Sequence, residues 1–276
     1  MSRTGFQRVR VAIIQVCSDD DLSGNLSRAE AGVAEAAARG AGFVSLPENF
    51  AYMCREGRRF PCAQWPKGEI VEALSEWSAR YGVWLLGGTF PEAIPGDDRV
   101  FNTSIMMDPT GQEIARYRKI HLFDVSLGAG DGDSYRESTH FAPGEELVLA
   151  QTDFGPIGLS VCYDLRFPEL YRSLTLQGAR WFVVPSAFTR ETGKDHWEVL
   201  LRARAIESQA YVVAPAQCGH HSADRSSHGR SLIIDPWGLV LAQAGDEPCV
   251  LIADCPTGAI DRVRAAVPAL QNVRLL

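Results

Sequence analysis

The sequence predicts an α/β protein, a four-layer α-β-β-α sandwich with an internal pseudo-two-fold duplication. Three observations support this fold class: strands alternate with helices, short sequences recur once, and no Pro/Ser-rich linker separates the halves. Of the 276 residues, 46% are hydrophobic and 22% charged, so the chain has enough apolar surface to fold. We therefore expect one domain in which two sheets face each other and helices cover their outer sides.

Apolar runs alternate with segments of helical spacing in both halves. In the first half, the predicted elements are strand Val9–Val16, helix Asn25–Arg39, strand Phe43–Leu46, helix Glu69–Arg80 and strand Val83–Gly87. In the second half they are strand Gly158–Val161, helix Pro168–Gln177, strand Trp181–Val184, helix His196–Ser208 and strand Tyr211–Ala214. Gly40 is expected to stop the first helix, and Pro47 to close the strand that follows it.

Two short sequences recur in the same order. Gly40–Pro47 is echoed by Gly178–Pro185, and Met107–Ile114 by Ile234–Leu241. The second pair shares Asp-Pro-x-Gly, in which Pro fixes φ and Gly supplies a positive φ, so each copy predicts a hairpin turn. Each repeated segment alone is a pattern common in strands and turns, but the two repeats occur in the same order, which favours a duplication. The Gly- and Asp-rich stretch Ser126–Ser138 is expected to be a functional surface loop.

Charge and composition exclude several classes of protein. The 27 Lys and Arg residues are outnumbered by 34 Asp and Glu without a long block of either sign, which argues against nucleic-acid binding. No apolar run approaches the roughly 20 residues that cross a bilayer, and Val11–Ile14 reads as a strand rather than a secretory signal. Seven cysteines without CxxC pairs argue against a disulfide framework or a zinc cluster. We therefore expect a cytoplasmic protein without metal, membrane or nucleic-acid partners.

Three residues at strand ends carry chemistry when they are taken together. Cys162 lies between a buried strand and a helix, where a thiol is exposed at the sheet edge and the next N–H, from Tyr163, can point at an oxyanion. Glu48 follows an apolar strand closed by Pro47, and Lys119 follows the first hairpin. Taken singly, none of them indicates catalysis: Cys162 could be a buried structural cysteine, and Glu48 and Lys119 could be solvated surface charges. Together they supply a nucleophile, a base and a cation for an oxyanion.

The segments around these residues closely resemble the signatures of the nitrilase superfamily of carbon–nitrogen hydrolases. The likeness covers nearly the whole chain, through Leu46–Asn49, Tyr117–Asp124, Val161–Leu170, Pro185–Phe188, His196–Glu207, Ala216–Gly219 and Gly229–Gly238. The resemblance implies the same four-layer sandwich, a single domain over residues 1–276, no cofactor, and assembly into homodimers or larger homo-oligomers.

The resemblance also implies a mechanism. Cys162 would attack an amide carbon while Glu48 takes the thiol proton, and Lys119 with the Tyr163 N–H would hold the oxyanion. Ammonia would leave a thioester, and Glu48 would activate the water that hydrolyses it. Glu137 matches a second glutamate of the family and is expected to orient Lys119 or the substrate amide.

Within the superfamily, the segments His121–Glu137 and Pro185–Glu207 look most like the Nit-type amidases, which act on small carboxylate-bearing amides. Among these substrates, the sequence of Ala216–Gly219 favours deaminated glutathione. An ω-amidase acting on α-ketoglutaramate, a carbamoylase and a nitrilase are alternatives. Arg166 and Arg190 are candidates for binding a substrate carboxylate, although Arg166 could equally form a structural ion pair with Asp164 or Glu169.

Two other classes of function remain open on the sequence. A papain-like hydrolase would need His196 beside Cys162, whereas His196 is expected to cap or pack against the helix that it precedes. A metal-binding module could use the cluster of Cys218, His220, His221 and His228, but its spacing lacks the usual zinc patterns.

Overall fold

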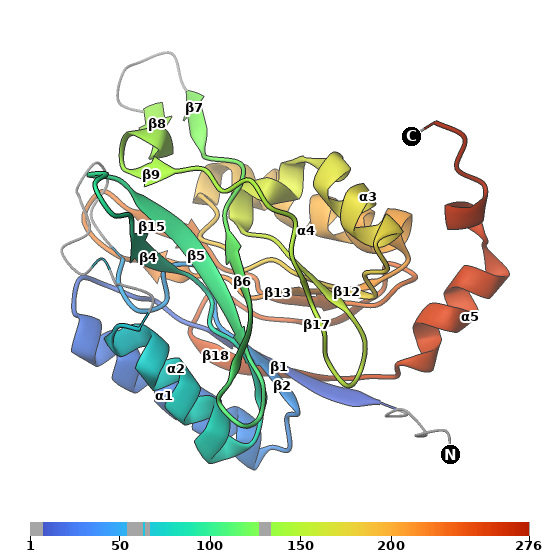
Figure 1. Cartoon of the computed structure of the whole chain (residues 1–276), viewed down its shortest axis with the longest axis horizontal. Coiled ribbons are helices and arrows are strands. Elements are labelled where there is room, and N and C mark those ends of the chain that lie inside the picture. Colours follow the sequence, from blue (N-terminus) through green and yellow to red (C-terminus); the bar gives the residue numbers. More distant parts are fainter. Residues whose placement is uncertain (1–7, 54–62, 64–66, 127–133, 276) are drawn as a thin grey trace.

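A computed structural model of the chain describes residues 8–53, 63, 67–126 and 134–275. Two β-sheets face each other in the middle of the molecule, with α1 and α2 outside one sheet and α3 and α4 outside the other (Figure 1). The predicted α-β-β-α sandwich is therefore confirmed. The helices are α1 Leu22–Ala38, α2 Glu69–Tyr81, α3 Pro168–Leu176, α4 Arg190–Ser208 and α5 Gly258–Ala266.

The first sheet has the strand order β18-β1-β2-β3-β5-β4, and β6 and β9 also pair with β5. Strands β1, β2 and β3 are parallel, whereas β18, β5 and β6 pair antiparallel with their neighbours. Its strands are β1 Val9–Gln15, β2 Phe43–Ser45, β3 Trp84–Leu86, β4 Phe90–Ala93, β5 Val100–Met107, β6 Glu113–Arg118, β9 Phe141–Ala142 and β18 Cys249–Cys255.

The second sheet has the order β10-β11-β12-β13-β16-β17 and repeats this pattern. Strands β11, β12 and β13 are parallel, and β10, β16 and β17 are antiparallel to their neighbours. Its strands are β10 Leu149–Ala150, β11 Ile157–Leu159, β12 Trp181–Val183, β13 Tyr211–Ala214, β16 Leu232–Ile234 and β17 Val240–Gln243. Two separate ribbons pair β7 Asp124–Ser126 with β8 Ser134–Arg136, and β14 Cys218–His220 with β15 Ser226–His228.

The duplication extends to a local irregularity. Both predicted hairpins form, as β5–β6 and β16–β17, and each has a register shift beside its turn, at Met106/Met107 and at Ile233/Ile234. These positions correspond in the repeated sequences, so the two halves share topology and register.

Alternation along β1 explains how one strand serves two cores. Val11 and Ile13 pack between the two sheets, while Ala12 and Ile14 pack under α1 and α2. Successive side chains of a strand point to opposite faces, so an uninterrupted apolar run is what a strand buried on both faces requires. No helix in the described ranges has the length and apolar character needed to cross a membrane.

Helix starts are where the sequence prediction fails most. Helix α1 begins at Leu22, because Asp21 caps it by accepting a hydrogen bond from the Gly24 N–H. Helix α4 begins at Arg190 rather than His196, with Thr189 as its cap. His196 therefore lies inside the helix, exposed, and the prediction that it precedes the helix is wrong. Within the predicted loop Ser126–Ser138, residues 127–133 lie outside the described residues, while Glu137–Thr139 form a 3₁₀ turn.

Candidate active site

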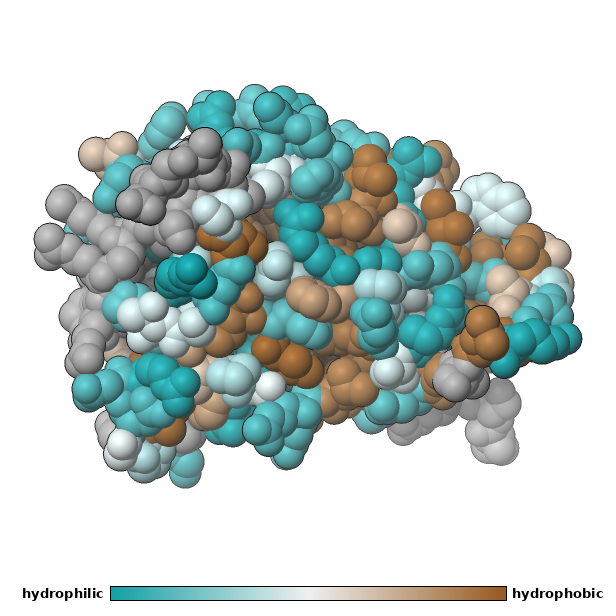
Figure 2. Space-filling model, turned by 90° about the horizontal axis from the view of Figure 1, so that it is seen from above, coloured by the Kyte–Doolittle hydropathy of each residue, from teal (hydrophilic) through white to brown (hydrophobic). Residues whose placement is uncertain are grey.

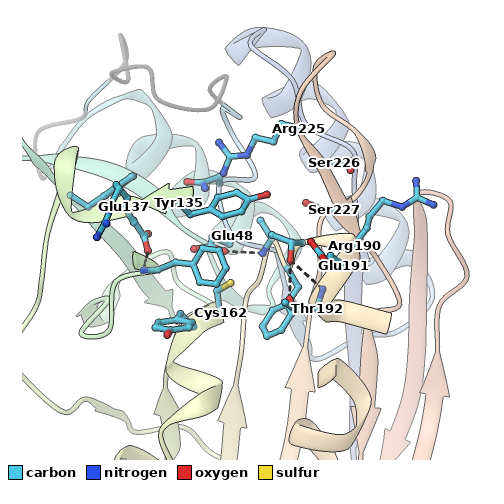
Figure 3. Close-up of a pocket in the computed structure, with 18 of the residues that line it drawn as sticks. Glu48, Tyr135, Glu137, Cys162, Arg190, Glu191, Thr192, Arg225, Ser226 and Ser227 are labelled. Carbon is cyan, nitrogen blue, oxygen red and sulfur yellow. Dashed lines mark hydrogen bonds between the residues drawn. The ribbon is translucent and has the colours of Figure 1, made fainter. Parts of the chain in front are cut away.

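The three candidate catalytic residues lie at the ends of strands from both sheets. Glu48 follows β2 and Lys119 follows β6, both in the first sheet, whereas Cys162 follows β11 in the second. Because the sheets face each other, these strand ends meet, and all three side chains line one cavity of about 570 Å³. The structure thus brings together residues that are far apart in the sequence, as Figure 3 shows for Glu48 and Cys162.

Glu48 is held from three sides. Its side chain is buried, and its Oε2 accepts a hydrogen bond from the Ala187 N–H at 2.8 Å, while Oε1 accepts one from Asn102 Nδ2 at 2.8 Å. Burial raises the pKa of Glu48, but the Lys119 charge and hydrogen bonds, including one from the Cys162 thiol, outweigh burial and bring the pKa below its ordinary value. The carboxylate is therefore ionised at neutral pH and lines the same cavity as the Cys162 thiol.

The backbone beside Glu48 is fixed by a close approach. Gly88 has a φ of 52°, and a Cβ at this position would lie 2.1 Å from the Pro47 carbonyl oxygen. Asn49, which also has a positive φ of 54°, donates its N–H to Thr89 Oγ1 at 2.9 Å. Glycine is needed at residue 88 because any side chain would push the Glu48 segment out of place.

Lys119 is buried between two carboxylates. Its Nζ lies 3.3 Å from Glu48 Oε1, and 2.9 and 2.8 Å from the two carboxylate oxygens of Glu137. Burial lowers the pKa of Lys119, but the charges of Glu137 and Glu48 outweigh it and raise the pKa above its ordinary value. Glu137 is itself oriented by the Phe123 N–H, which donates to Oε2 at 2.6 Å. A permanently charged ammonium therefore stands beside the thiol.

Cys162 occupies a backbone conformation that few residues adopt. It has a φ of 48°, in the left-handed region, and begins the 3₁₀ turn Cys162–Arg166. Burial raises the pKa of the thiol, and the Glu48 charge raises it further. One ammonium between two carboxylates already leaves a net negative charge, so a free thiolate is disfavoured. The thiol is thus neutral at rest and must lose its proton to Glu48 as it attacks.

The second residue of this turn is Tyr163. The first N–H groups of a helical turn have no partner within the turn, so the Tyr163 N–H is available to an oxygen bound above the thiol. Its ring lines the cavity together with Phe123, Tyr135 and Phe188. The catalytic end of the cavity is therefore charged at its base and aromatic at its sides.

The far wall of the cavity is polar and comes from the second half. Thr192 and Arg190 belong to the start of α4, and Arg225, Ser226 and Ser227 to the β14–β15 ribbon and its turn. Figure 3 shows the Arg225 side chain reaching over Tyr135, whereas the Arg190 side chain points away from the thiol. Arg190 Nη1 lies 3.4 Å from His220 Nε2 at the surface.

Arg166 and His196 do not lie where the sequence hypotheses need them. Arg166 is not among the described residues that line the cavity; its Nη1 lies 3.3 Å from His196 Nδ1, and its guanidinium group lies 5.4 Å from the Phe188 ring centroid. The carboxylate that shares the cavity with the thiol is Glu48, whereas His196 is not among the described residues that line it. The geometry therefore supports neither a papain-like pair nor an Arg166–Asp164 ion pair.

In the histidine-rich β14–β15 ribbon, both ring nitrogens of His221 already form hydrogen bonds within the protein. His221 is buried, with Nδ1 2.8 Å from the Ser18 carbonyl oxygen and Nε2 2.8 Å from Ser227 Oγ. Among the described residues, no three His, Cys, Asp or Glu side chains are grouped so that they could hold a metal ion.

Sequence reasoning missed the groups that hold Glu48. Asn102 lies in the middle of β5, and the Ala187 N–H belongs to the segment after β12. Gln217 donates to the Glu48 carbonyl oxygen at 3.0 Å and to Ser18 Oγ at 2.9 Å. No local pattern marks these contacts, although the Pro47/Pro185 echo could have indicated that residues 48 and 187 leave equivalent strands.

Comparison with known proteins gives consistent results. The sequence model of the carbon-nitrogen hydrolase family matches residues 10–265. A deaminated glutathione amidase of Synechocystis sp. is 44% identical over 264 residues, 95% of this chain and 96% of that protein. The human deaminated glutathione amidase is 40% identical over 96% of this chain and 82% of its own length.

Two solved structures have the same fold. The C. elegans NitFhit protein superposes with a TM-score of 0.87 at 34% identity, over 98% of this chain and 66% of that one. Saccharomyces cerevisiae Nit3, a member of branch 10 of the nitrilase superfamily, gives a TM-score of 0.84 at 31% identity, over 97% of both chains.

Proposed function

The chain belongs to the carbon–nitrogen hydrolase family, and on that premise we propose that it is a cysteine amidase that hydrolyses a small, carboxylate-bearing amide without a cofactor. The observation that carries the proposal is that Glu48, Lys119 and Cys162 converge on one cavity, with the Lys119 ammonium 3.3 Å from the Glu48 carboxylate. The relatives named deaminated glutathione amidase support a deaminated glutathione-like substrate.

The first half of the reaction forms a thioester. Glu48 takes the thiol proton as Cys162 Sγ attacks the amide carbon, and the carbonyl oxygen becomes an oxyanion bound by Lys119 Nζ and the Tyr163 N–H. Glu48 then passes its proton to the amide nitrogen, and the carbon–nitrogen bond breaks. Glu137 keeps the Lys119 ammonium in place throughout.

In the second half, Glu48 takes a proton from a water molecule, which attacks the thioester carbon. The carbon–sulfur bond breaks, the sulfur regains a proton, and the acid product leaves. The group that leaves when the thioester forms depends on the substrate. A glutathione-like amide has no primary amide group, so a dipeptide amine leaves, whereas α-ketoglutaramate would release ammonia; ammonia release is thus expected only for the second type.

The proposed anchors for the substrate carboxylate are the arginines at the far wall. Arg225 already reaches over the cavity, and Arg190 can turn inward from its surface contact with His220. Arg166 lies behind the Tyr163 and Phe188 rings, so we do not retain it as a direct ligand.

One experiment tests the function. Deaminated glutathione, α-ketoglutaramate, N-carbamoyl-β-alanine and a simple nitrile are supplied side by side, and acid, amine and ammonia products are quantified. We expect the highest kcat/KM with deaminated glutathione, no ammonia from it, a thioester adduct at Cys162 by mass spectrometry, and no turnover by Cys162→Ala. Full activity of Cys162→Ala would defeat the proposal.

We further propose a cytoplasmic protein that assembles into a homodimer or a larger homo-oligomer, in which residues 1–276 of each chain form one domain. Exposed apolar residues gather on α4 and on the adjacent β16–β17 turn, and these support self-association: Val199, Ile206, Trp237 and Leu239. The space-filling view in Figure 2 shows apolar residues lying among polar ones on a face of the molecule. Light scattering that gave the mass of a single chain would contradict this assembly.

A further inference from the structure

A buried carboxylate outside the catalytic set joins the two sheets directly behind the site. Asp164 lies two residues after the nucleophile, is fully buried, and is not among the residues that line the cavity. A buried ionised group is costly unless it is fully hydrogen-bonded, so its partners indicate what it does.

Within the described part of the chain, the side-chain hydrogen bonds of Asp164 run to the two segments that carry Lys119 and Cys162. On the first sheet, Tyr117 Oη donates to Oδ2 at 2.7 Å, and the His121 N–H donates to Oδ1 at 3.0 Å, with His121 Nδ1 2.7 Å from the same oxygen. On the second sheet, the Val161 N–H donates to Oδ2 at 2.8 Å.

The contacts on the first sheet flank Lys119 on both sides. Tyr117 precedes it by two residues and His121 follows it by two, and Tyr117 Oη also accepts the Ile120 N–H at 3.3 Å. The His121 ring is stacked on Phe167, with centroids 3.7 Å apart and planes 6° apart. The backbone that carries the ammonium is therefore tied at several points to the turn that carries the thiol.

We propose that Asp164, through Tyr117 and His121, is a positioning residue that sets the distance between the Lys119 ammonium and the Cys162 thiol. Glu137 and Glu48 hold the ammonium end of the lysine, whereas Asp164 holds its backbone relative to the nucleophile on the opposite sheet. Asp164 touches no reacting atom, so its effect is on the placement of the oxyanion donor rather than on proton transfer. This inference rests on the proposed function, because it concerns an oxyanion formed at Cys162.

The chain offers a matched pair of variants. Tyr117→Phe removes the hydroxyl that reaches Asp164 from the Lys119 segment. Tyr171→Phe removes another buried tyrosine hydroxyl, which lies 2.8 Å from Ser160 Oγ, two residues before Cys162, and forms no hydrogen bond to the Lys119 segment within the described residues. Each variant loses one buried hydroxyl near the same turn, so a loss of packing affects both alike.

Two reactions of each variant are measured. Amide hydrolysis forms an oxyanion, whereas alkylation of Cys162 by iodoacetamide, followed on the Cys162 peptide by mass spectrometry, displaces iodide and forms none. For Tyr117→Phe we expect kcat for the amide to fall about 10-fold with KM and the alkylation rate changed less than about 2-fold. Tyr171→Phe should change each less than about 2-fold, and Asp164→Asn should lower kcat about 100-fold with alkylation largely kept.

Three outcomes would overturn the inference: equal effects of the two tyrosine variants, an unchanged kcat in Tyr117→Phe, or a parallel fall in alkylation and hydrolysis. The Tyr117→Phe comparison decides the matter if Asp164→Asn does not fold. Failure of the proposed function is a separate result, since the wild-type enzyme would then hydrolyse no amide or Cys162→Ala would remain active.

Discussion

The two halves of the molecule share a framework but differ at the strand ends where the chemistry lies. Strands β18-β1-β2-β3-β5-β6 match β10-β11-β12-β13-β16-β17 in order and direction. Aligned on the repeated sequences and the strand register, Glu48 corresponds to Ser186, Lys119 to Asp246 and Cys162 to Val16. Neither half holds the whole set, so the site exists only where the two sheets face each other.

The comparison predicts that replacing a catalytic residue in one half lowers the rate of hydrolysis, whereas replacing the corresponding residue of the other half does not. Glu48→Gln keeps the shape of the side chain but removes the base, so we expect kcat to fall about 1,000-fold. Ser186→Ala removes a buried hydroxyl that donates to the Val184 carbonyl oxygen, and kcat should stay within about 3-fold of wild type. Steady-state kinetics on both variants checks this, and comparable losses would break the comparison.

The lysine gives a second contrast, of smaller effect. Lys119→Met removes the oxyanion donor, and we expect kcat to fall about 100-fold. It also leaves Glu48 and Glu137 without their cation, so thermal unfolding should shift to lower temperature. Its counterpart Asp246 forms an exposed ion pair with Arg230 at 2.8 Å, and Asp246→Asn should leave the melting temperature close to that of wild type because solvent screens such a pair. Similar melting curves for the two variants would argue against the buried charge cluster.

Acid should weaken a contact between the halves. Burial lowers the pKa of His221, on the ribbon of the second half, to about 4, from an ordinary value of 6.5. The neutral ring bonds the Ser18 carbonyl oxygen of the first half. Since the unfolded chain takes up this proton first, the stability is present above pH 6.5 and is lost as the pH falls towards 4, by about 3 kcal/mol in all.

Denaturant unfolding at several pH values between 7 and 4 measures this effect. His221→Gln should flatten the slope of the free energy of unfolding over that window. An unchanged slope in the variant would assign the acid sensitivity to other groups.

The smallest expected effect concerns helix α1, which packs on β1 and β18 of the first sheet. Asp21 caps α1 through the Gly24 N–H at 3.1 Å and is not among the described residues that line the cavity. Asp21→Ala should lower the free energy of unfolding by about 1 kcal/mol and leave kcat unchanged. A loss of activity larger than the loss of folded protein would show that the outer helix layer influences the site.

The sequence predicted the strand ends better than it predicted what holds them. Glu48 was identifiable because an apolar strand and Pro47 precede it, and both signals are local. The helix start at Arg190 was missed because Arg190–Asp195 is polar and contains Gly193, which signals a loop. In the structure a Cβ at Gly193 would lie 2.4 Å from the His228 ring, so the glycine is required where α4 packs against the β14–β15 ribbon. The roles of Asn102 and Asp164 were also missed, because they depend on partners that are distant in the sequence. Asn102 bonds Glu48 across 54 residues, and Asp164 bonds Tyr117 and His121 across 47 and 43 residues.

The left-handed backbone at Cys162 places the nucleophile at a cost in folding stability. A residue with a side chain pays roughly 1 kcal/mol or more to hold such a φ, whereas glycine adopts it freely. Cys162→Gly should therefore relieve the backbone strain but remove the nucleophile, so the protein would be inert. The strained backbone at this position therefore serves the placement of the thiol rather than the stability of the fold.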